Sequence, residues 1–396
     1  MADIVLEAQP DLNADLTRDD VEKDDFKSEE MLVNMGPQHP ATHGVLRIVL
    51  RTDGEMVLEA VPHIGYLHRC AEKIGENIPP YQYIPYTDRM DYLAGMNNNL
   101  AFALAVEKLT GLEVSKRATY IRVVFAELNR IASHLVAMGT YGLDIGAITP
   151  FLYAFRERER ILDLFESACG ARLTYSYITI GGVTADLPDR FIDVCTEFLD
   201  YFEPKIDEYN NLLSFNHIFV KRTANVGVVT AKEALDWGLT GPCLRASGVR
   251  WDLRKVQPDC AYDEFEFDIP IGEGLKGTIG DCWDRYFVRI LEMKQSIRII
   301  RQVFERLPSE TGDVLHKKGK TIKLPADDIY YEIENPRGQL GFYIQGDGST
   351  IPYRTKARGP SFCNLGIVNI ICSNCLLGDV AAIIGSIDVV MGEVDR

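Results

Sequence analysis

Residues 88–110 read DRMDYLAGMNNNLAFALAVEKLT, and their spacing predicts a long helix. Apolar side chains recur three or four positions apart and so share one helical face; they are Leu93, Met96, Leu100, Ala103 and Leu104. We expect Asp88 to cap the N-terminus of this helix and Gly111 to stop it.

Further helices are expected later in the chain. They cover residues 118–138, 151–169 and 281–307, and another begins at Pro188, where a missing N–H costs nothing. Gly139 is expected to close the helix at 118–138. Pro204 is expected to kink the helix that starts at Pro188. Helices of about twenty residues joined by short connections are typical of a bundle.

Strand signals flank the helical part on both sides. Residues 45–61 alternate around Asp53-Gly54, which predicts a β-hairpin. Residues 330–333 and 341–344 read as strands around a turn at 335–338. The expected fold class is therefore α+β, with an N-terminal β-hairpin, a central helical bundle and C-terminal β elements.

These patterns divide the chain into four parts. We expect an acidic flexible tail (1–30), a hairpin with a loop for the functional site (31–87), the helical bundle (88–307) and a C-terminal α/β segment (308–396) that opens on a polar loop at 308–328.

Charge and composition exclude several classes of protein. The 396 residues carry a net charge of −16, so a bulk basic surface for nucleic acid is missing. Half of that charge lies in residues 1–30, which lack the apolar core of a signal peptide and the Arg-rich composition of a transit peptide. No run of about 18 apolar residues predicts a membrane span. The nine cysteines, an odd number, indicate reduced thiols in a cytoplasmic setting.

Two motifs suggest cofactors but fit other roles better. Residues 272–277, GEGLKG, match the dinucleotide fingerprint G-x-G-x-x-G, but the preceding Phe265-Glu266-Phe267-Asp268 alternates with charge, unlike a buried Rossmann strand. Cys372 and Cys375 form a lone C-x-x-C pair without the second pair that a closed zinc or iron–sulfur site needs. Two small side chains near a turn are the simpler interpretation.

Histidines cluster between residues 39 and 68. His39 and His43 have the i, i+4 spacing of a helical metal site, but Gly36, Pro37 and Pro40 break any helix there. A metal site, a rigid loop that directs an imidazole at a small molecule, and simple turn chemistry all stay open.

Several ordered motifs carry a family resemblance that runs from about Val33 to Arg396. They are residues 36–47 (GPQHPATHGVLR), 63–69 (HIGYLHR), 88–93 (DRMDYL), 149–159 (TPFLYAFRERE), 244–248 (LRASG) and 392–396 (GEVDR). Together they resemble the quinone-site core protein of respiratory complex I, which is its D-type or 49-kDa-type subunit.

The resemblance implies a fold similar to the large subunit of nickel–iron hydrogenases. Those enzymes hold their metals with two Cys-x-x-Cys pairs, which would fall near residues 88–93 and 388–396, where this chain has no cysteine. We therefore expect no metal and a former metal cavity that serves a quinone. The implied function is the quinone-reducing core subunit of a membrane-bound, proton-translocating NADH:quinone oxidoreductase.

The resemblance also implies roles for individual residues. His43 and Tyr92 resemble the ligands of the quinone headgroup, and Asp144 resembles the carboxylate that pairs with the histidine. Reduction develops negative charge on two ring oxygens, and a tyrosine hydroxyl and a protonated histidine are suitable donors. Other residues are expected to line the pocket: His39, Asp91, Asp388 and Arg396.

Electrons are expected from a 4Fe–4S cluster in an adjacent subunit, because this chain binds no cofactor of its own. Arg69 and Thr174 match family positions near that cluster. Two departures from the family pattern stand out, since Cys70 replaces a usual glycine and Thr174 a common histidine.

The implied partners are other complex I subunits. They include the subunit that carries the terminal cluster, the C-type partner and the membrane subunit at the quinone entrance, with a peripheral location on the cytoplasmic face of the bacterial inner membrane. Two alternatives stay open: a hydrogenase-related oxidoreductase with another redox partner, and a scaffold subunit without catalysis.

Overall fold

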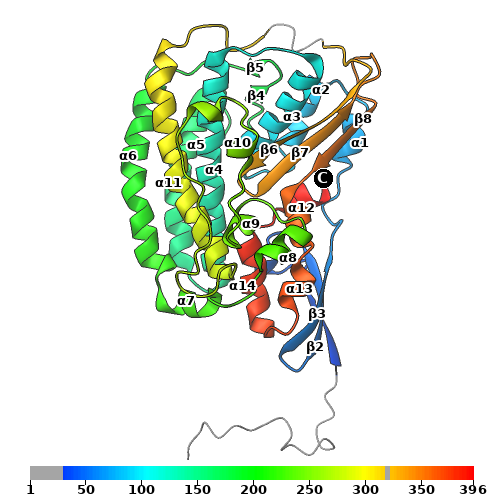
Figure 1. Cartoon of the computed structure of the whole chain (residues 1–396), viewed down its shortest axis with the longest axis vertical. Helices are drawn as coiled ribbons and strands as arrows, with labels where there is room; N and C mark the ends of the chain where they lie inside the picture. Colours follow the sequence, from blue (N-terminus) through cyan, green and yellow to red (C-terminus); the bar gives the residue numbers. More distant parts are fainter. Residues whose placement is uncertain (1–29, 317–321) are drawn as a thin grey trace, which may run out of the picture.

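The computed structural model describes residues 30–316 and 322–396. The acidic tail predicted for 1–30 lies outside these residues except for Glu30, and so does the middle of the predicted loop at 308–328. Long helices occupy one side of the molecule, and two three-stranded sheets lie on the other (Figure 1).

Four long helices run side by side as a bundle (Figure 1). They are α4 (Lys116–Asp144), α5 (Ile148–Cys169), α6 (Phe191–Tyr209) and α11 (Cys282–Arg306). Helix α4 is buried along most of its length, with α5 and α11 packed against it. Ser115 caps its start, because its Oγ accepts a hydrogen bond from the N–H of Ala118 at 3.2 Å. The predicted bundle is therefore present, with α4 at its centre.

Gly139 does not end this central helix, which continues to Asp144. A Cβ at position 139 would lie 3.1 Å from the Cα of Phe151 in α5. The glycine therefore allows two helices to approach closely, and the prediction that it closes the helix is wrong. The extra turns carry the chain to Asp144, one of the predicted site residues.

The helix predicted from Asp88 begins later, because α3 spans Gly95–Thr110. Asp88 instead follows α2 (Pro80–Thr87) as its C-cap residue. Its carboxylate accepts hydrogen bonds from the N–H and the hydroxyl of Ser176, at 2.9 and 2.7 Å. Burial raises the pKa of Asp88 to about 6. The predicted N-cap is wrong because a distant loop supplies the partners of this carboxylate.

Helix α6 also begins later than predicted, at Phe191 rather than Pro188. Arg190 has a left-handed backbone with φ of 62°, which a right-handed helix cannot include. Pro204 lies inside this helix, and the kink expected there stays a prediction.

The two larger sheets are antiparallel and more extensive than predicted. β2 (Arg47–Asp53) and β3 (Met56–His63) form the expected hairpin, and β1 (Glu30–Met35) adds a third strand. β6 (Asp328–Asn335) and β7 (Gly338–Gln345) form the second hairpin, which β8 (Arg354–Arg358) extends. Helix α3 packs against β6 and β7, so this sheet joins the helical core.

Shorter elements connect these parts. They are a 3-10 turn η1 (Pro40–Thr42), α1 (Ala71–Gly75), β4 (Ile178–Thr179), β5 (Gly182–Val183), α7 (His217–Thr223), α8 (Ala231–Asp236), α9 (Pro242–Ala246), α10 (Leu253–Val256), α12 (Pro360–Leu365), α13 (Val368–Cys372), α14 (Leu377–Ile387) and α15 (Met391–Asp395). The mixture of helices and small sheets agrees with the predicted α+β class. Among residues 30–316 and 322–396, no helix has the length and apolar character needed to span a membrane.

The bundle buries paired charges as well as apolar side chains. Glu127 of α4 accepts hydrogen bonds from Arg254 at 3.1 Å, from the Tyr262 hydroxyl at 2.7 Å and from Ser296 at 2.6 Å. Burial opposes ionisation, but Arg130 and Arg254 hold the pKa of Glu127 below its usual value. The interior therefore tolerates charge where each group has partners.

Candidate functional site

The loop after β1 presents His43 to the end of the central helix. His39 precedes the 3-10 turn η1, and its Nδ1 accepts a hydrogen bond from the N–H of Ala41 at 3.2 Å. Thr42 is buried and donates from its hydroxyl to the carbonyl of His39 at 2.8 Å. His43 follows with a left-handed backbone, φ of 48°. The turn therefore fixes the direction of the His43 side chain.

His43 pairs with Asp144 across 101 positions of sequence. Nε2 of the imidazole lies 2.6 Å from Oδ2 of the carboxylate, with the two side chains 10% and 4% exposed. Asp144 is the last residue of α4, where the helix dipole favours a neighbouring cation. The carboxylate and the helix end therefore both face the imidazole.

Helix α14 packs against this pair at Gly385. A Cβ at Gly385 would lie 2.8 Å from Oδ2 of Asp144 and 2.6 Å from the ring of Tyr141. Any larger side chain at 385 would have to displace one of them. The same helix packs against η1, the turn that directly precedes His43.

A second group of charges is buried around Arg337. Its Nη1 lies 2.8 Å from Asp91, its Nη2 lies 3.3 Å from Asp388, and its Nε donates to the carbonyl of Asp388 at 3.0 Å. Burial acts against the charge of Arg337, but Asp388 and Asp91 raise its pKa above the usual range. Burial raises the pKa of Asp91, although Arg337 opposes the shift. One arginine thus joins two of the predicted pocket residues.

Tyr92 is half-buried beside this group. Burial raises the pKa of its phenol. The positive charge of Arg337 opposes this shift, and the negative charge of Asp91 adds to it. The hydroxyl therefore keeps its proton at neutral pH and is able to donate a hydrogen bond.

The C-terminal segment connects the His43 loop to the segment that carries Tyr92. A Cβ at Gly44 would lie 3.4 Å from Cγ of Met391, and a Cβ at Gly392 would lie 2.5 Å from the carbonyl oxygen of Met90. Helix α15, which holds Met391 and Gly392, is therefore a common neighbour of both segments.

Residues 63–69 hold the C-terminus in place. Asp395 accepts hydrogen bonds from the N–H groups of Gly65 at 2.8 Å and Leu67 at 2.7 Å. Arg69 donates from its backbone to the carbonyl of Arg396 at 3.0 Å and from its guanidinium to the carbonyl of Arg89 at 2.6 Å. These contacts join two of the sequence motifs to the chain end.

Comparison with known proteins gives the family. A family model described as the 49 Kd subunit of respiratory-chain NADH dehydrogenase matches residues 144–323 and 315–396. The chain belongs to this family. The resemblance drawn from the motifs is therefore confirmed.

Several curated relatives match nearly the whole chain and are named as D subunits of NADH-quinone oxidoreductase. The D subunit of Chlorobium luteolum is 53% identical over 378 residues, covering 95% of each chain. The D subunit of Desulforamulus reducens is 54% identical over 370 residues, covering 93% of this chain and 99% of the relative. A D subunit of Cytophaga hutchinsonii is 50% identical over 384 residues, covering 94% and 97%.

The other residues predicted from the family resemblance lie in different surroundings. His39 is exposed, and its ring caps the local turn. Arg396 donates to the carbonyl of Ala357 at 2.6 Å and to Glu72 at 3.4 Å, which directs its side chain toward β8 and α1. Thr174 lies in the loop after α5 and donates to the carbonyl of Leu173 at 2.6 Å.

Left-handed backbone recurs among the predicted site residues of this 49-kDa-family chain. It occurs at His43, Thr174, Asp388 and Arg396, with φ between 48° and 60°. Such a conformation costs a non-glycine residue about 1–3 kcal/mol, and residues that adopt it cluster at functional sites. The surrounding structure must therefore hold each of these residues in place.

Sequence reasoning missed two residues of this region. Arg337 lies in the turn between β6 and β7, and nothing in a turn pattern indicates a buried guanidinium. Glu393 is buried in α15 and accepts a hydrogen bond from the N–H of Ser361 at 3.0 Å. Burial raises the pKa of Glu393 to about 8, with Asp91 adding to the shift. Its place in the C-terminal motif was the available signal.

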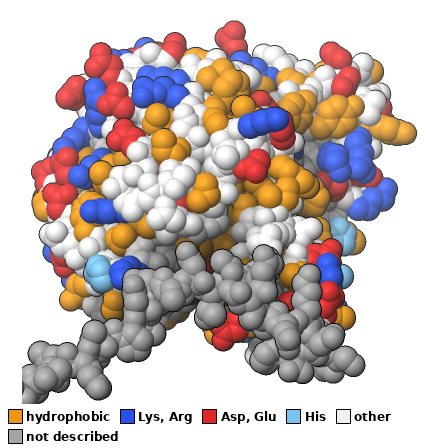
Figure 2. Space-filling view, turned by 60° about the horizontal axis from the view of Figure 1, so that its bottom comes forward, with side chains coloured by type: hydrophobic (Ala, Val, Ile, Leu, Met, Phe, Trp, Pro, Cys, Tyr) orange, Lys and Arg blue, Asp and Glu red, His pale blue; other side chains and the backbone are white. Residues whose placement is uncertain are grey.

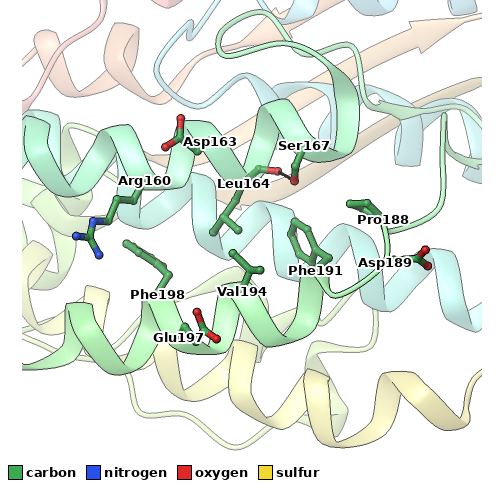
Figure 3. Close-up of a pocket in the computed structure, with 10 residues that line it drawn as sticks. All are labelled: Arg160, Asp163, Leu164, Ser167, Pro188, Asp189, Phe191, Val194, Glu197 and Phe198. Carbon is green, nitrogen blue, oxygen red and sulfur yellow. Dashed lines mark hydrogen bonds between the residues drawn. The ribbon is translucent and has the colours of Figure 1, made fainter.

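A groove between α5 and α6 lies apart from these residues (Figure 3). It has a volume of about 440 Å³, an apolar floor that includes Leu164, Phe191 and Phe198, and acidic side chains such as Asp163 and Glu197 at its rim. No predicted site residue lines it. Among residues 30–316 and 322–396, no group of three or more His, Cys, Asp or Glu side chains is arranged to hold a metal ion.

Proposed function

We propose that this chain is the quinone-reducing core subunit of a membrane-bound, proton-translocating NADH:quinone oxidoreductase, respiratory complex I. The observation that carries the proposal is the match of about half the residues to a D subunit of NADH-quinone oxidoreductase over 95% of the chain. The paired imidazole and carboxylate of His43 and Asp144 add a chemical reason. The fold proposed is that of the hydrogenase large subunit, with the metal site replaced by a quinone site.

His43 and Tyr92 would bind the quinone headgroup. Reduction adds two electrons and two protons, and each ring oxygen needs a hydrogen-bond donor as negative charge develops. A protonated His43 and the Tyr92 hydroxyl are donors that also hold transferable protons. Asp144 orients the imidazole through a contact of 2.6 Å. Asp144 would thus act on the quinone through His43.

The remaining predicted residues would line the quinone pocket. Arg337 pairs with Asp91 and Asp388, and Arg289 lies 3.8 Å from Asp388. Two cations thus offset the two carboxylates, which would shape the site without placing a free negative charge beside a developing oxyanion. His39 and Arg396 would lie at its margins.

Electrons would come from a 4Fe–4S cluster in an adjacent subunit. Arg69 is exposed, so its charge is available at the surface to a reduced cluster of a neighbour. Thr174 is expected on the same side. The C-type partner is expected as a further neighbour.

The membrane subunit at the quinone entrance would contact an apolar end of the molecule. Figure 2 turns forward the end of the molecule that holds α7, α14 and the β2–β3 turn, and exposed hydrophobic side chains are present on the surface in this view. Residues of these elements include Ile218, Met56 and Leu377, exposed by 68%, 39% and 37%. Exposed apolar side chains that gather on one face are typical of interfaces. The location would be peripheral, on the cytoplasmic face of a bacterial inner membrane.

Quinone reduction by the assembled complex tests this function. His43→Ala and Tyr92→Phe should each lower turnover by roughly 10²–10³, the usual effect of losing one oxyanion donor, while assembly is preserved. His217→Ala and Tyr353→Phe are matched controls, because both side chains are exposed away from the pair. Normal turnover in an assembled His43→Ala/Tyr92→Phe variant would refute the assignment.

A further inference from the structure

Cys372 and Cys375 lie at the two ends of a tight turn between α13 and α14. Ser373 has φ of −68° and ψ of 131°, and Asn374 has φ of 61°, which together define a type II turn. The N–H of Cys375 donates to the carbonyl of Cys372 at 3.4 Å and closes this turn. Asparagine suits the third position because it tolerates positive φ.

This turn brings the two cysteines within reach of a covalent bond. The first and last Cα atoms of a β-turn lie within about 7 Å of each other, and disulfides join Cα atoms about 4.4–6.8 Å apart. The two thiols are also close enough for each to shift the pKa of the other. Only a small movement is therefore needed to join the sulfur atoms.

The two thiols differ in exposure and acidity. Cys372 is fully buried, whereas Cys375 is partly exposed. The neighbouring Cys372 thiol holds the pKa of Cys375 below its usual value, although burial and Asp379 oppose the shift. Arg222 pairs with Asp379 at 2.9 Å and so weakens that opposition. Cys375 is the accessible nucleophile, and Cys372 is the protected thiol behind it.

We propose that Cys372 and Cys375 form a redox-active dithiol that converts to an intramolecular disulfide by exchange with a low-molecular-weight disulfide. The Cys375 thiolate attacks one sulfur of the small disulfide, forms a mixed disulfide and expels a small thiolate. Cys372 then loses its proton and attacks Sγ of Cys375, which expels the second small thiolate. Two protein thiols are oxidised, one small disulfide is reduced to two thiols, and the two cysteine protons go to these products.

The turn is connected to the predicted quinone site through backbone contacts. Val57 of β3 donates to the carbonyl of Cys375 at 2.9 Å and accepts from the N–H of Asn374 at 2.7 Å. Helix α14 begins directly after the turn and packs against η1, the turn that precedes His43. Closing the disulfide would shift the start of α14, and we expect slower quinone reduction. This consequence rests on the proposed function, whereas the disulfide itself does not.

Thiol labelling of the purified full-length chain tests the chemistry. After exposure to glutathione disulfide, free thiols are blocked, the disulfides are reduced, and a second label marks the thiols released. We expect two second labels on the tryptic peptide 359–396, at Cys372 and Cys375, and none at Cys363 of the same peptide. Cys363→Ser is the matched control and should keep both labels.

Two variants separate the roles of the thiols. In Cys372→Ser the reaction should stop at a glutathione adduct on Cys375, whereas Cys375→Ser should leave the buried Cys372 unlabelled. An unmodified pair in the wild type, or a crosslink from Cys372 to Cys282 in another peptide, would overturn the proposal.

Activity of the assembled complex gives an independent reading. Oxidation should lower quinone reduction and dithiothreitol should restore it, while Cys372→Ser/Cys375→Ser should be insensitive to both. A disulfide that forms without any change in turnover would refute the link to the site. Absence of quinone reduction in every sample would instead refute the proposed function, and the labelling result would still stand.

Discussion

Gly385→Ala should disturb the His43–Asp144 pair without touching either residue. The new methyl group would lie 2.6 Å from the Tyr141 ring and 2.8 Å from the Asp144 carboxylate, well inside van der Waals contact. Overpacking of this kind costs about 1–3 kcal/mol, partly offset by about 1 kcal/mol from the better helix propensity of alanine. We expect a net loss of stability on the order of 1 kcal/mol.

The effect on turnover should be larger than the effect on stability. Hydrogen bonds to charged groups contribute about 1.5–3 kcal/mol. Displacing Asp144 from His43 should therefore lower quinone reduction about 10- to 100-fold if that interaction acts in the transition state. Urea unfolding of the chain and quinone reduction by the assembled complex measure the two effects separately.

Gly378→Ala is the matched control in the same helix. A Cβ there meets only Nη2 of Arg222, at 3.6 Å, which is an ordinary contact. This variant should keep wild-type turnover and be at least as stable as the wild type, because alanine gains helix propensity here without a close contact. Equal behaviour of the two alanine variants would show that α14 does not hold Asp144 against His43 in the way described.

Three further predictions concern charge. The pKa of Glu393 is raised to about 8 in the folded chain, against an unfolded value of about 4.3. The stability that the protonated Glu393 contributes is therefore complete below pH about 4 and is lost as the pH rises to about 8. Glu393→Gln should therefore flatten the decline in urea midpoint over this window, and a decline as steep as in the wild type would contradict the assignment. Arg337→Leu removes the ion pair of the buried Asp91 and leaves Asp388 with Arg289 at 3.8 Å, so it should destabilise the chain by about 3–5 kcal/mol. Arg190→Leu, at a side chain 76% exposed, should stay within about 0.5 kcal/mol of the wild type in the same urea assay. Threonine cannot titrate, so the potential of the neighbouring cluster should depend weakly on pH between about 6 and 8. Thr174→His should steepen the pH dependence of this potential toward about 59 mV per pH unit. Redox titration by electron paramagnetic resonance measures the slope, and an unchanged slope in the variant would show that Thr174 does not lie near the cluster.

The sequence by itself determined the α+β class, the helical bundle and the family. Helical and strand periodicities are local properties, so residues 88–110 and 45–61 predict their elements without knowledge of the fold. The order of the motifs along the chain is linear information as well. His43, Tyr92 and Asp144 could therefore be identified as candidates, although their roles stay predictions.

Tertiary structure decided what those local patterns could not. The sequence pattern predicts a helix stop at Gly139, yet in the fold this glycine allows α5 to pack closely against α4. Asp88 reads as an N-cap, yet Ser176, 88 positions away, provides its hydrogen bonds. Glycine and aspartate can each play several structural roles. Which role a given residue plays depends on the neighbours that tertiary packing brings close to it.

The same reason explains the buried arginine. Arg337 lies in a turn, where charged residues are ordinarily solvated, but it pairs with Asp91 and Asp388, 246 and 51 positions away. Burying a guanidinium is favourable only when carboxylates arrive from other parts of the chain to offset its desolvation. That condition is met by the folded arrangement of the end of α14, the β6–β7 turn and the segment before α3, and no stretch of sequence contains it.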